Sequence, residues 1–378
     1  MFISVWASAL LVQLDKAMRQ PLCVGRAKSS LPHFLFCIDS SFYAIFTLLN
    51  KLLEICRMSG SNRILWADAL KAFAIIFVML GHVLPFVMGD KANPMTIHYI
   101  GVLQMPLFMA ISGYCSYKAF VEWLVVKKRF LQLVVPFICW PLVWYLIKMD
   151  FTGITDYYLA LFIFPDRGLW FLFVLFLITL IEYFRNKVVR ISLKNHDNSD
   201  IAFYFSLLVT ECLLLTVFYA YKRCGVPGNW INFVALYYPY YSLGCIMRRN
   251  NNWLLSNLRW LGPLGLLVYS IATYFLDSYL WQIPLASGGI LGMFFIFQRF
   301  FDRPLPRIIM FTGTSTLGIY AVHQPVIQYI KHLLIKAPLW ADVVITFVLT
   351  YIISILAVWV FKKNRITAFL FLGIPFRR

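Results

Sequence analysis

Three ionisable side chains lie within one apolar stretch of the chain, Leu65–Met88: Asp68, Lys71 and His82. Lys71 and His82 are eleven positions apart, which in an α-helix is about three turns, a rise of about 16 Å and a residual rotation of roughly 20°. Asp68 precedes Lys71 by three residues and therefore lies on the same helix face. The spacing predicts a polar stripe with opposite charges at one end and, at the other, an imidazole that can accept a proton near neutral pH.

This stripe has two interpretations, because charged groups within a membrane span are costly and need a structural or functional reason. Asp68 and Lys71 either belong to a reaction site or form a structural pair near the interface, where Lys can extend its ammonium group to water. His82 favours the functional interpretation, since an apolar residue at its position would make the span more stable.

A second histidine, His323, lies in the late apolar segment Thr316–Pro325, beside Gln324 and three residues after Tyr320. Pro325 lacks the N–H of an ordinary helix residue, so it can leave a nearby backbone carbonyl free to bind another group. His323, Tyr320 and Gln324 are candidates for a second polar part of the site. The alternative is a core histidine that is hydrogen-bonded to a neighbouring helix.

Two further polar residues interrupt apolar runs. Ser112 follows Pro106 in Gln104–Tyr114, where a Pro and a Ser-Gly step indicate a backbone that faces protein or a cavity. Glu211 lies in the middle of another run, and we expect it either to be protonated or to pair with a cation such as Lys71.

A basic cluster, Lys127, Lys128 and Arg129, precedes the next apolar run. Membrane topology alone can explain it, because loops on the cytoplasmic side are rich in Lys and Arg. The functional interpretation is a site for phosphate groups, since an Arg side chain binds phosphate oxygens through two parallel hydrogen bonds.

The composition indicates which elements hold these residues. Hydrophobic residues make up 61% of the chain and charged residues 13%, whereas soluble domains are about 45–50% apolar and about 25% charged. We therefore predict an all-α polytopic membrane protein with about ten transmembrane helices. The expected spans are Leu65–Met88, Ile97–Tyr117, Phe130–Ile147, Gly168–Phe184, Ile201–Tyr221, Ile231–Met247, Leu261–Leu276, Tyr279–Phe297, Ile308–Ile330 and Trp340–Phe361.

The positive charge is distributed unevenly over the loops between these spans. If Arg63 is cytoplasmic, twenty of the 34 Lys and Arg residues lie on that side and seven on the other. Loops rich in Lys and Arg mark the cytoplasmic side of membrane proteins, so both termini are predicted to be cytoplasmic. The same distribution explains the net charge of +18 without nucleic-acid binding.

The rest of the chain adds three expectations. The eight cysteines form no C-x-x-C pair, and we predict no metal site. Residues 1–57 are expected to be an N-terminal extension that is dispensable or not translated, because Met58 directly precedes a polar, basic start to the first span. We expect the membrane domain to cover 58–365 and a basic cytoplasmic tail to cover 366–378.

Several of these segments resemble the acyltransferase-3 family of membrane O-acyltransferases, in the family's order and over about residues 60–365. The most specific element is a basic residue followed after ten positions by a histidine, here Lys71 and His82, where many members have Arg in place of Lys. Gly318–Pro325 resembles the sugar O-acetylase (fucose 4-O-acetylase-like) branch. The other matching segments are Arg63–Lys71, Gly81–His82, Pro106–Phe108, Ile111–Tyr114, Lys128–Arg129 with Pro136, and Leu169–Leu172.

The resemblance implies transfer of an acyl group, usually acetyl from acetyl-CoA, to a sugar hydroxyl of a cell-surface polysaccharide or its lipid-linked precursor, in the cytoplasmic (inner) membrane of a bacterium. It implies that His82 is the catalytic histidine, that Lys71 acts with it and that Arg129 lies near the donor phosphates. Ser112, Tyr320 or Gln324 could stabilise the oxyanion. The expected partners are acyl-CoA as donor substrate, with no bound cofactor, the sugar acceptor and membrane lipids.

Other interpretations stay open at this point. A glycan-precursor transporter or flippase would predict internal repeats, which we do not find in the sequence, and a non-catalytic scaffold of envelope synthesis would not need His82. The sequence also leaves open whether His82 is a general base or an acyl carrier. It does not indicate the acceptor sugar, acetyl as against succinyl, or the oligomeric state.

Overall fold

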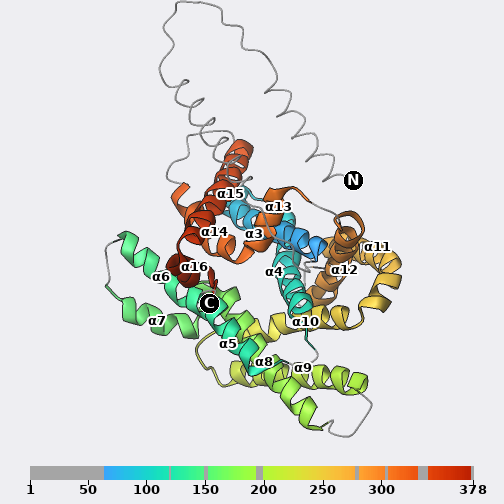
Figure 1. The fold of residues 1–378 in the computed structure, drawn as a ribbon. Helices are drawn as coiled ribbons and strands as arrows, with labels where there is room; N and C mark the ends of the chain where they lie inside the picture. Colours follow the sequence, from blue (N-terminus) through green and yellow to red (C-terminus); the bar gives the residue numbers. More distant parts are fainter. Residues whose placement is uncertain are drawn as a thin grey trace, which may run out of the picture. The chain divides into compact units, whose positions relative to one another are not determined.

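The computed structural model describes residues 64–118, 121–148, 152–192, 199–276, 281–302, 305–330 and 339–375. All regular secondary structure in these ranges is helical (Figure 1), so the predicted all-α class is confirmed. The expected extension 1–57 and the expected start at Met58 lie outside the described residues.

The helices follow most of the predicted spans within a few residues. Their bounds are α3 Leu65–Met88, η1 Gly89–Lys91, α4 Pro94–Ser116, α5 Trp123–Arg129, η2 Phe130–Val134, α6 Val135–Lys148, α7 Ile154–Ile163, η3 Pro165–Arg167, α8 Trp170–Ser192, α9 Ser199–Arg223, α10 Trp230–Arg249, α11 Asn251–Phe275, α12 Gln282–Phe300, α13 Arg307–Thr314, α14 Thr316–Ile330, α15 Leu339–Lys363 and α16 Arg365–Leu372.

Five helices in the described part are long and apolar enough to cross a membrane. They are Leu65–Lys91, Pro94–Ser116, Asp200–Arg223, Gln282–Phe300 and Leu339–Lys363. Apolar side chains on α9 are largely exposed, for example Phe205 at 64% and Leu213 at 59%. In a multi-pass membrane protein, such a surface is expected to face lipid. The full count of ten spans stays a prediction.

Two predicted spans are interrupted. The third is divided between the π-helical turn η2 and α6, and the helix begins earlier than predicted, with α5. The ninth is broken at Ser315, which leaves the helical conformation with ψ near 11°. The reason lies in a run of hydroxyl residues: Thr312 and Thr314 donate to carbonyls of their own helix, and such local bonds compete with continued helix formation.

The fourth predicted span is longer than expected, and this corrects the position of Arg185. The predicted span ends at Phe184, which leaves Arg185 outside it, whereas α8 continues beyond Arg185 and buries its side chain. Glu182 explains the difference, because it accepts hydrogen bonds from Arg185 Nε at 3.0 Å and Nη2 at 2.7 Å. Tyr238 donates a further bond to the same carboxylate at 2.6 Å, so the charge is paired inside the bundle.

Part of the predicted basic tail is helical. Helix α16 packs against α6, and the indole N–H of Trp140 donates to the carbonyl oxygen of Phe371 at 3.0 Å. Beyond α16, Gly373 lies so close to η2 that a Cβ there would collide with the carbonyl oxygen of Gln132. The end of the described chain therefore rests on the π-helical turn.

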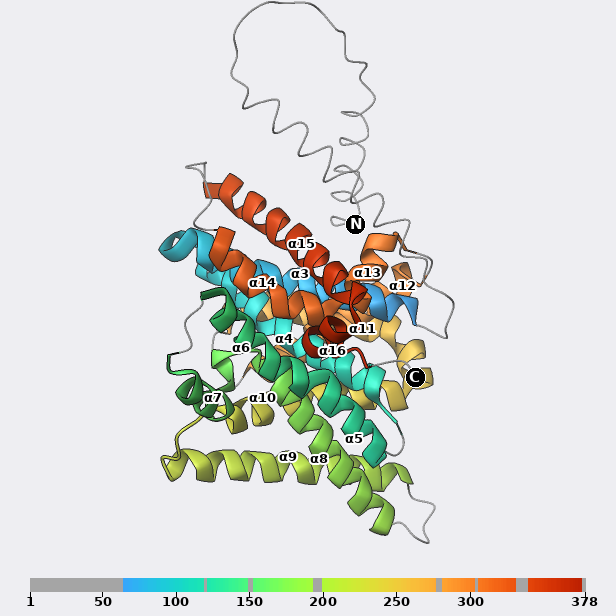
Figure 2. The same ribbon diagram turned by 60° about the vertical axis from the view of Figure 1, so that its left-hand side comes forward.

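Helix α3 is central to the bundle, because it packs against α4, α12, α13, α14 and α15. Figures 1 and 2 both show α9 and α15 at opposite edges with α3 and α4 between them. Helix α4 in turn contacts α10 with almost no side chain in between. A Cβ on Gly113 would collide with the carbonyl oxygen of Tyr241, and one on Gly244 with that of Ala110.

The α4–α10 crossing generates a testable prediction. Gly244→Val should lower the yield of folded protein and the free energy of unfolding by about 1–3 kcal/mol, because the branched side chain forces two backbones apart. Thermal unfolding of the purified protein in detergent measures the change. Gly101→Ala, on α4 with no atom within 4 Å of the added Cβ, is the matched control. Equal stability of Gly244→Val and wild type would contradict this packing.

Candidate active site

The Asp68–Lys71 pair lies on the first turns of α3. Lys71 Nζ donates to Asp68 Oδ1 at 3.0 Å, and the side chains are 26% and 9% exposed respectively. The two groups share one helix face, as their spacing predicts. Helix α13 lies directly against this turn, because a Cβ on Gly313 would collide with the carbonyl oxygen of Asp68.

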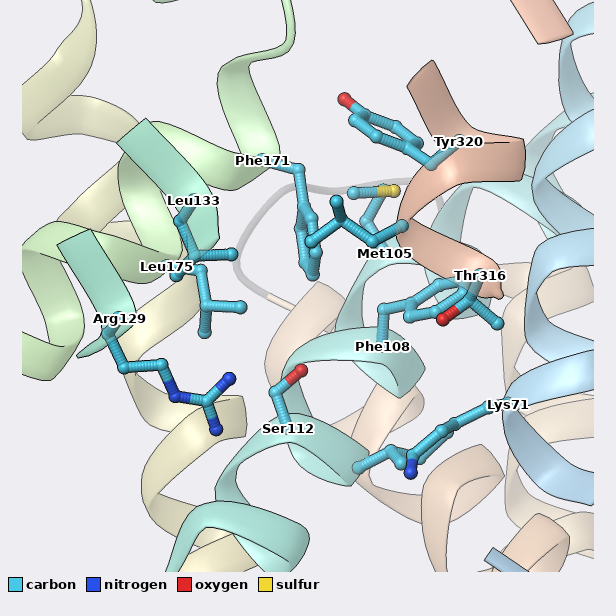
Figure 3. A pocket seen from close by; sticks show the side chains of 12 residues that line it. Lys71, Met105, Phe108, Ser112, Arg129, Leu133, Phe171, Leu175, Thr316 and Tyr320 are labelled. Carbon is cyan, nitrogen blue, oxygen red and sulfur yellow. The ribbon is translucent and has the colours of Figure 1, made fainter. Parts of the chain in front are cut away.

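Beside this pair is a cavity of about 140 Å³, which we call the Lys71 cavity. Figure 3 shows Lys71 and Arg129 on opposite walls at one end, with Ser112 between them. Tyr320 and Phe171 stand at the other end. The wall between the two ends is mostly apolar, with Met105, Phe108, Ile111, Leu133, Leu175 and Leu317. The cavity thus joins a cationic end to an aromatic end.

Arg129 is the last residue of α5, directly before the π-helical turn. Its Nη2 donates to Ser116 Oγ at 2.5 Å, which holds the guanidinium group toward α4. A π-helical turn carries an extra residue and is frequent at functional sites. Lys127 and Lys128 are exposed and do not line the Lys71 cavity, so of the predicted basic cluster Arg129 alone faces it.

The break between α13 and α14 extends the site on the Lys71 side. Lys71 and Thr316 also line a neighbouring cavity of about 430 Å³, together with Asp68 and Thr314. Lys71 therefore lies between the two cavities. The polar run around Ser315 was the sequence signal for this break, and we did not use it.

His82, towards the other end of α3, lies against His323 of α14. The rings of His82 and His323 lie with their centroids 5.2 Å apart and their planes inclined at 45°. His323 is 1% exposed, and its Nδ1 lies 2.6 Å from the carbonyl oxygen of Tyr320. Since a carbonyl only accepts, Nδ1 carries the proton in the neutral ring and Nε2 offers a lone pair. This buried Nε2 has no hydrogen-bond partner among the described residues.

Tyr320 links the histidine pair to the Lys71 cavity. Its ring lines the cavity and lies 5.6 Å from the ring of His323, centroid to centroid. The ring of Phe171 also packs against the ring of Tyr320, with their centroids 5.7 Å apart. The aromatic end of the cavity is therefore one side chain away from the two imidazoles.

The remaining candidates lie elsewhere. Glu211 faces α10, where Ser242 Oγ is 3.5 Å from its Oε1, and the alternative of pairing with Lys71 is wrong because Lys71 is bound to Asp68. Gln324 points to a different cavity from the one Tyr320 lines. Sequence reasoning missed Gln104, whose unpartnered Oε1 sits where a Cβ on Gly81 would be.

Within the described ranges, no group of three His, Cys, Asp or Glu side chains lies close enough together to bind a metal ion.

Comparison with known proteins identifies a family that this chain matches. Residues 64–361 match the family described as "Acyltransferase domain". Nodulation protein NolL of Mesorhizobium japonicum is 28% identical over 214 residues, which are 52% of this chain and 51% of that protein. The chain thus spans about half the length of the curated relative it matches. No solved structure matches this chain.

The ion pair of α3 can be tested by stability. Asp68→Asn should lower the free energy of unfolding by about 1–3 kcal/mol, because it leaves a largely buried ammonium group without its counter-charge. Asp200→Asn is the matched control, since that carboxylate is 75% exposed in its pair with Arg249, and it should cost less than about 1 kcal/mol. Denaturant titration of both variants measures the difference. Equal effects would contradict the burial of the α3 pair.

Proposed function

This chain belongs to the acyltransferase family, and on that premise we propose that it transfers an acetyl group from cytoplasmic acetyl-CoA to a sugar hydroxyl of a cell-surface polysaccharide or its lipid-linked precursor. The observation that carries the proposal is the Lys71 cavity, which has two cations at one end and Tyr320 at the other. The ring of Tyr320 lies against that of His323, which in turn contacts His82. The protein would act in the cytoplasmic membrane, with the Lys71 end of α3 toward the cytoplasm.

The cationic end suits the donor. Coenzyme A is a polyanion of the cytoplasm, and the guanidinium group of Arg129 matches phosphate oxygens in charge and geometry. Lys71 is already paired with Asp68. It can therefore donate a hydrogen bond to the donor substrate, but its charge is partly neutralised, unlike that of Arg129. We therefore assign the phosphates to Arg129 and give Lys71 the role of orienting the arm that follows them.

The lining of the cavity also suits the part of the donor between its phosphates and its thioester. Apolar walls at Phe108, Leu133 and Leu175 suit the uncharged arm of the donor.

The histidine pair supplies acid–base chemistry. In the proposed step His82 takes the proton of the sugar hydroxyl while the oxygen attacks the thioester carbon. The oxyanion collapses, the C–S bond breaks, and the coenzyme A sulfur leaves with the proton from His82. Ser112 and Tyr320 both line the cavity, at opposite ends. Tyr320, which lies beside His323, would donate to the oxyanion.

His323 would act through His82. Its Nε2 needs a donor, and one N–H of His82 can provide it after a small rotation, since catalytic hydrogen bonds often tighten only when substrate is bound. The Tyr320 carbonyl fixes the tautomer of His323, and His323 would in turn fix that of His82. The free nitrogen of His82 then faces the reaction as a base.

Removing the base should abolish the reaction. His82→Ala is expected to lower kcat for acetyl transfer by about 10²-fold or more, and His323→Ala, as a positioning residue, by a smaller factor. Transfer is measured with radiolabelled acetyl-CoA and a panel of methyl glycosides, using the full chain in nanodiscs. Unchanged thermal unfolding of both variants controls for folding. Undiminished transfer by His82→Ala would remove this residue from the mechanism.

Removing the phosphate-binding cation should act on the donor alone. Arg129→Ala is expected to raise the KM for acetyl-CoA by about tenfold or more, the equivalent of a lost charge-assisted hydrogen bond, with a smaller change in kcat. Arg259→Ala is the matched control, because Arg259 is exposed on α11 and lines neither cavity beside Lys71. An unchanged KM in Arg129→Ala would exclude Arg129 from donor binding.

A further inference from the structure

A second cavity lies beside the following turns of α14, and the proposed reaction does not use it so far. It has a volume of about 140 Å³, and we call it the Gln324 cavity. The residues that matter for its chemistry are Trp140, Tyr157, Asp166, Ala321, Gln324 and Gln328. Its walls come from α6, α7, the turn before α8, and α14.

The Gln324 cavity and the Lys71 cavity share two structural walls. On α14, Tyr320 lines the Lys71 cavity and the next residue, Ala321, lines the Gln324 cavity. Near the start of α8, Phe171 lines the Lys71 cavity and Leu169 lines the Gln324 cavity. Because residues four apart in a helix share a face, Tyr320 and Gln324 lie on the same side of α14, and the two cavities follow one another along it. His323 belongs to that stretch of α14.

The two cavities differ in charge. The Lys71 cavity has an ammonium and a guanidinium group in its lining. Among the described residues that line the Gln324 cavity there is no Lys or Arg, and there is the carboxylate of Asp166. The second cavity therefore offers no cation to bind a polyanion, whereas a neutral ligand needs none.

The polar groups of the Gln324 cavity suit a ligand with many hydroxyl groups. Gln324 and Gln328 each present an amide that both donates and accepts, and Asp166 accepts. Pro325 has no N–H to donate to the carbonyl of Ala321, so this backbone oxygen keeps acceptor capacity at the cavity wall.

The aromatic groups give such a ligand an apolar surface. The indole N–H of Trp140 is bound to the Phe371 carbonyl at 3.0 Å, which fixes the orientation of the ring. Tyr157 is half-buried in the same lining. Sites of this kind combine ring surfaces with a few placed polar groups, and a sugar has both a C–H face and hydroxyl edges.

We infer that the Gln324 cavity binds an uncharged sugar residue of the acceptor, whose hydroxyl meets the thioester at the Tyr320 end of the Lys71 cavity, beside the histidine pair. The inference rests on the proposed function, because it assigns the two substrates of one transfer reaction to neighbouring cavities along one helix. Asp166, Gln324 and Gln328 are then specificity-determining residues for the acceptor, whereas Arg129 and Lys71 serve the donor.

Kinetics with two substrates test the assignment. Gln324→Ala should raise the KM for methyl glycosides by about fivefold, the effect of one lost neutral hydrogen bond, with the KM for acetyl-CoA unchanged. Gln328→Trp should fill the cavity and abolish transfer while acetyl-CoA still binds. Gln282→Ala, at the start of α12 and outside the Gln324 cavity, is the matched control. A raised KM for acetyl-CoA in Gln324→Ala, with that of the glycoside unchanged, would overturn the assignment.

Direct binding separates this inference from the proposed function. Saturation-transfer NMR uses the full chain in nanodiscs with methyl glycosides of glucose, galactose, fucose and N-acetylglucosamine, without acetyl-CoA. We expect a signal in wild type and Arg129→Ala that Gln328→Trp abolishes. If that pattern is seen and wild type transfers no acetyl group, the sugar site stands and the proposed reaction is wrong. A signal that persists in Gln328→Trp, or no signal from any glycoside in wild type, overturns the sugar site.

Discussion

The structure depends on how polar groups are accommodated within an apolar helix bundle. A buried charge or hydrogen-bonding group without a partner is strongly destabilising, and more so where no water is present. Lys71 is therefore bound to Asp68, Arg185 to Glu182, and the Nδ1 of His323 to a backbone carbonyl. Against this background the Nε2 of His323 is significant, because it keeps a hydrogen-bonding capacity that no other described residue uses.

Accommodation of these groups requires close contact between helix backbones. Gly313 brings α13 against the carbonyl of Asp68, which fixes the turn that carries Lys71. Gly113 and Gly244 do the same for α4 and α10, and α4 carries Ser112 into the Lys71 cavity. Small residues give helices in a membrane their closest packing. The glycine contacts thus place the polar residues as firmly as their own hydrogen bonds do.

The sequence predicted the regular parts of this arrangement well and the irregular parts poorly. Helix α3 has its predicted bounds, because apolar length and periodicity determine a span. The π-helical turn after Arg129 was not predicted, because it lies in a largely apolar run. The break at Ser315 was not predicted either, although the hydroxyl residues of Thr312–Thr316 indicate it. The contact of His82 with His323 joins positions far apart in sequence, and no spacing rule reports which helices are neighbours.

The irregular elements are also the ones that separate the two cavities. The turn at Arg129 aims one guanidinium group inward, while Lys127 two residues earlier stays exposed. Pro325 keeps the carbonyl of Ala321 out of the regular hydrogen-bond ladder beside the second cavity. The cations therefore line one cavity and the hydroxyl-binding groups line the next one along α14. If the two ligands bind as proposed, they meet at the Tyr320 end of the Lys71 cavity, where His323 lies against Tyr320 and α3 places His82 against His323.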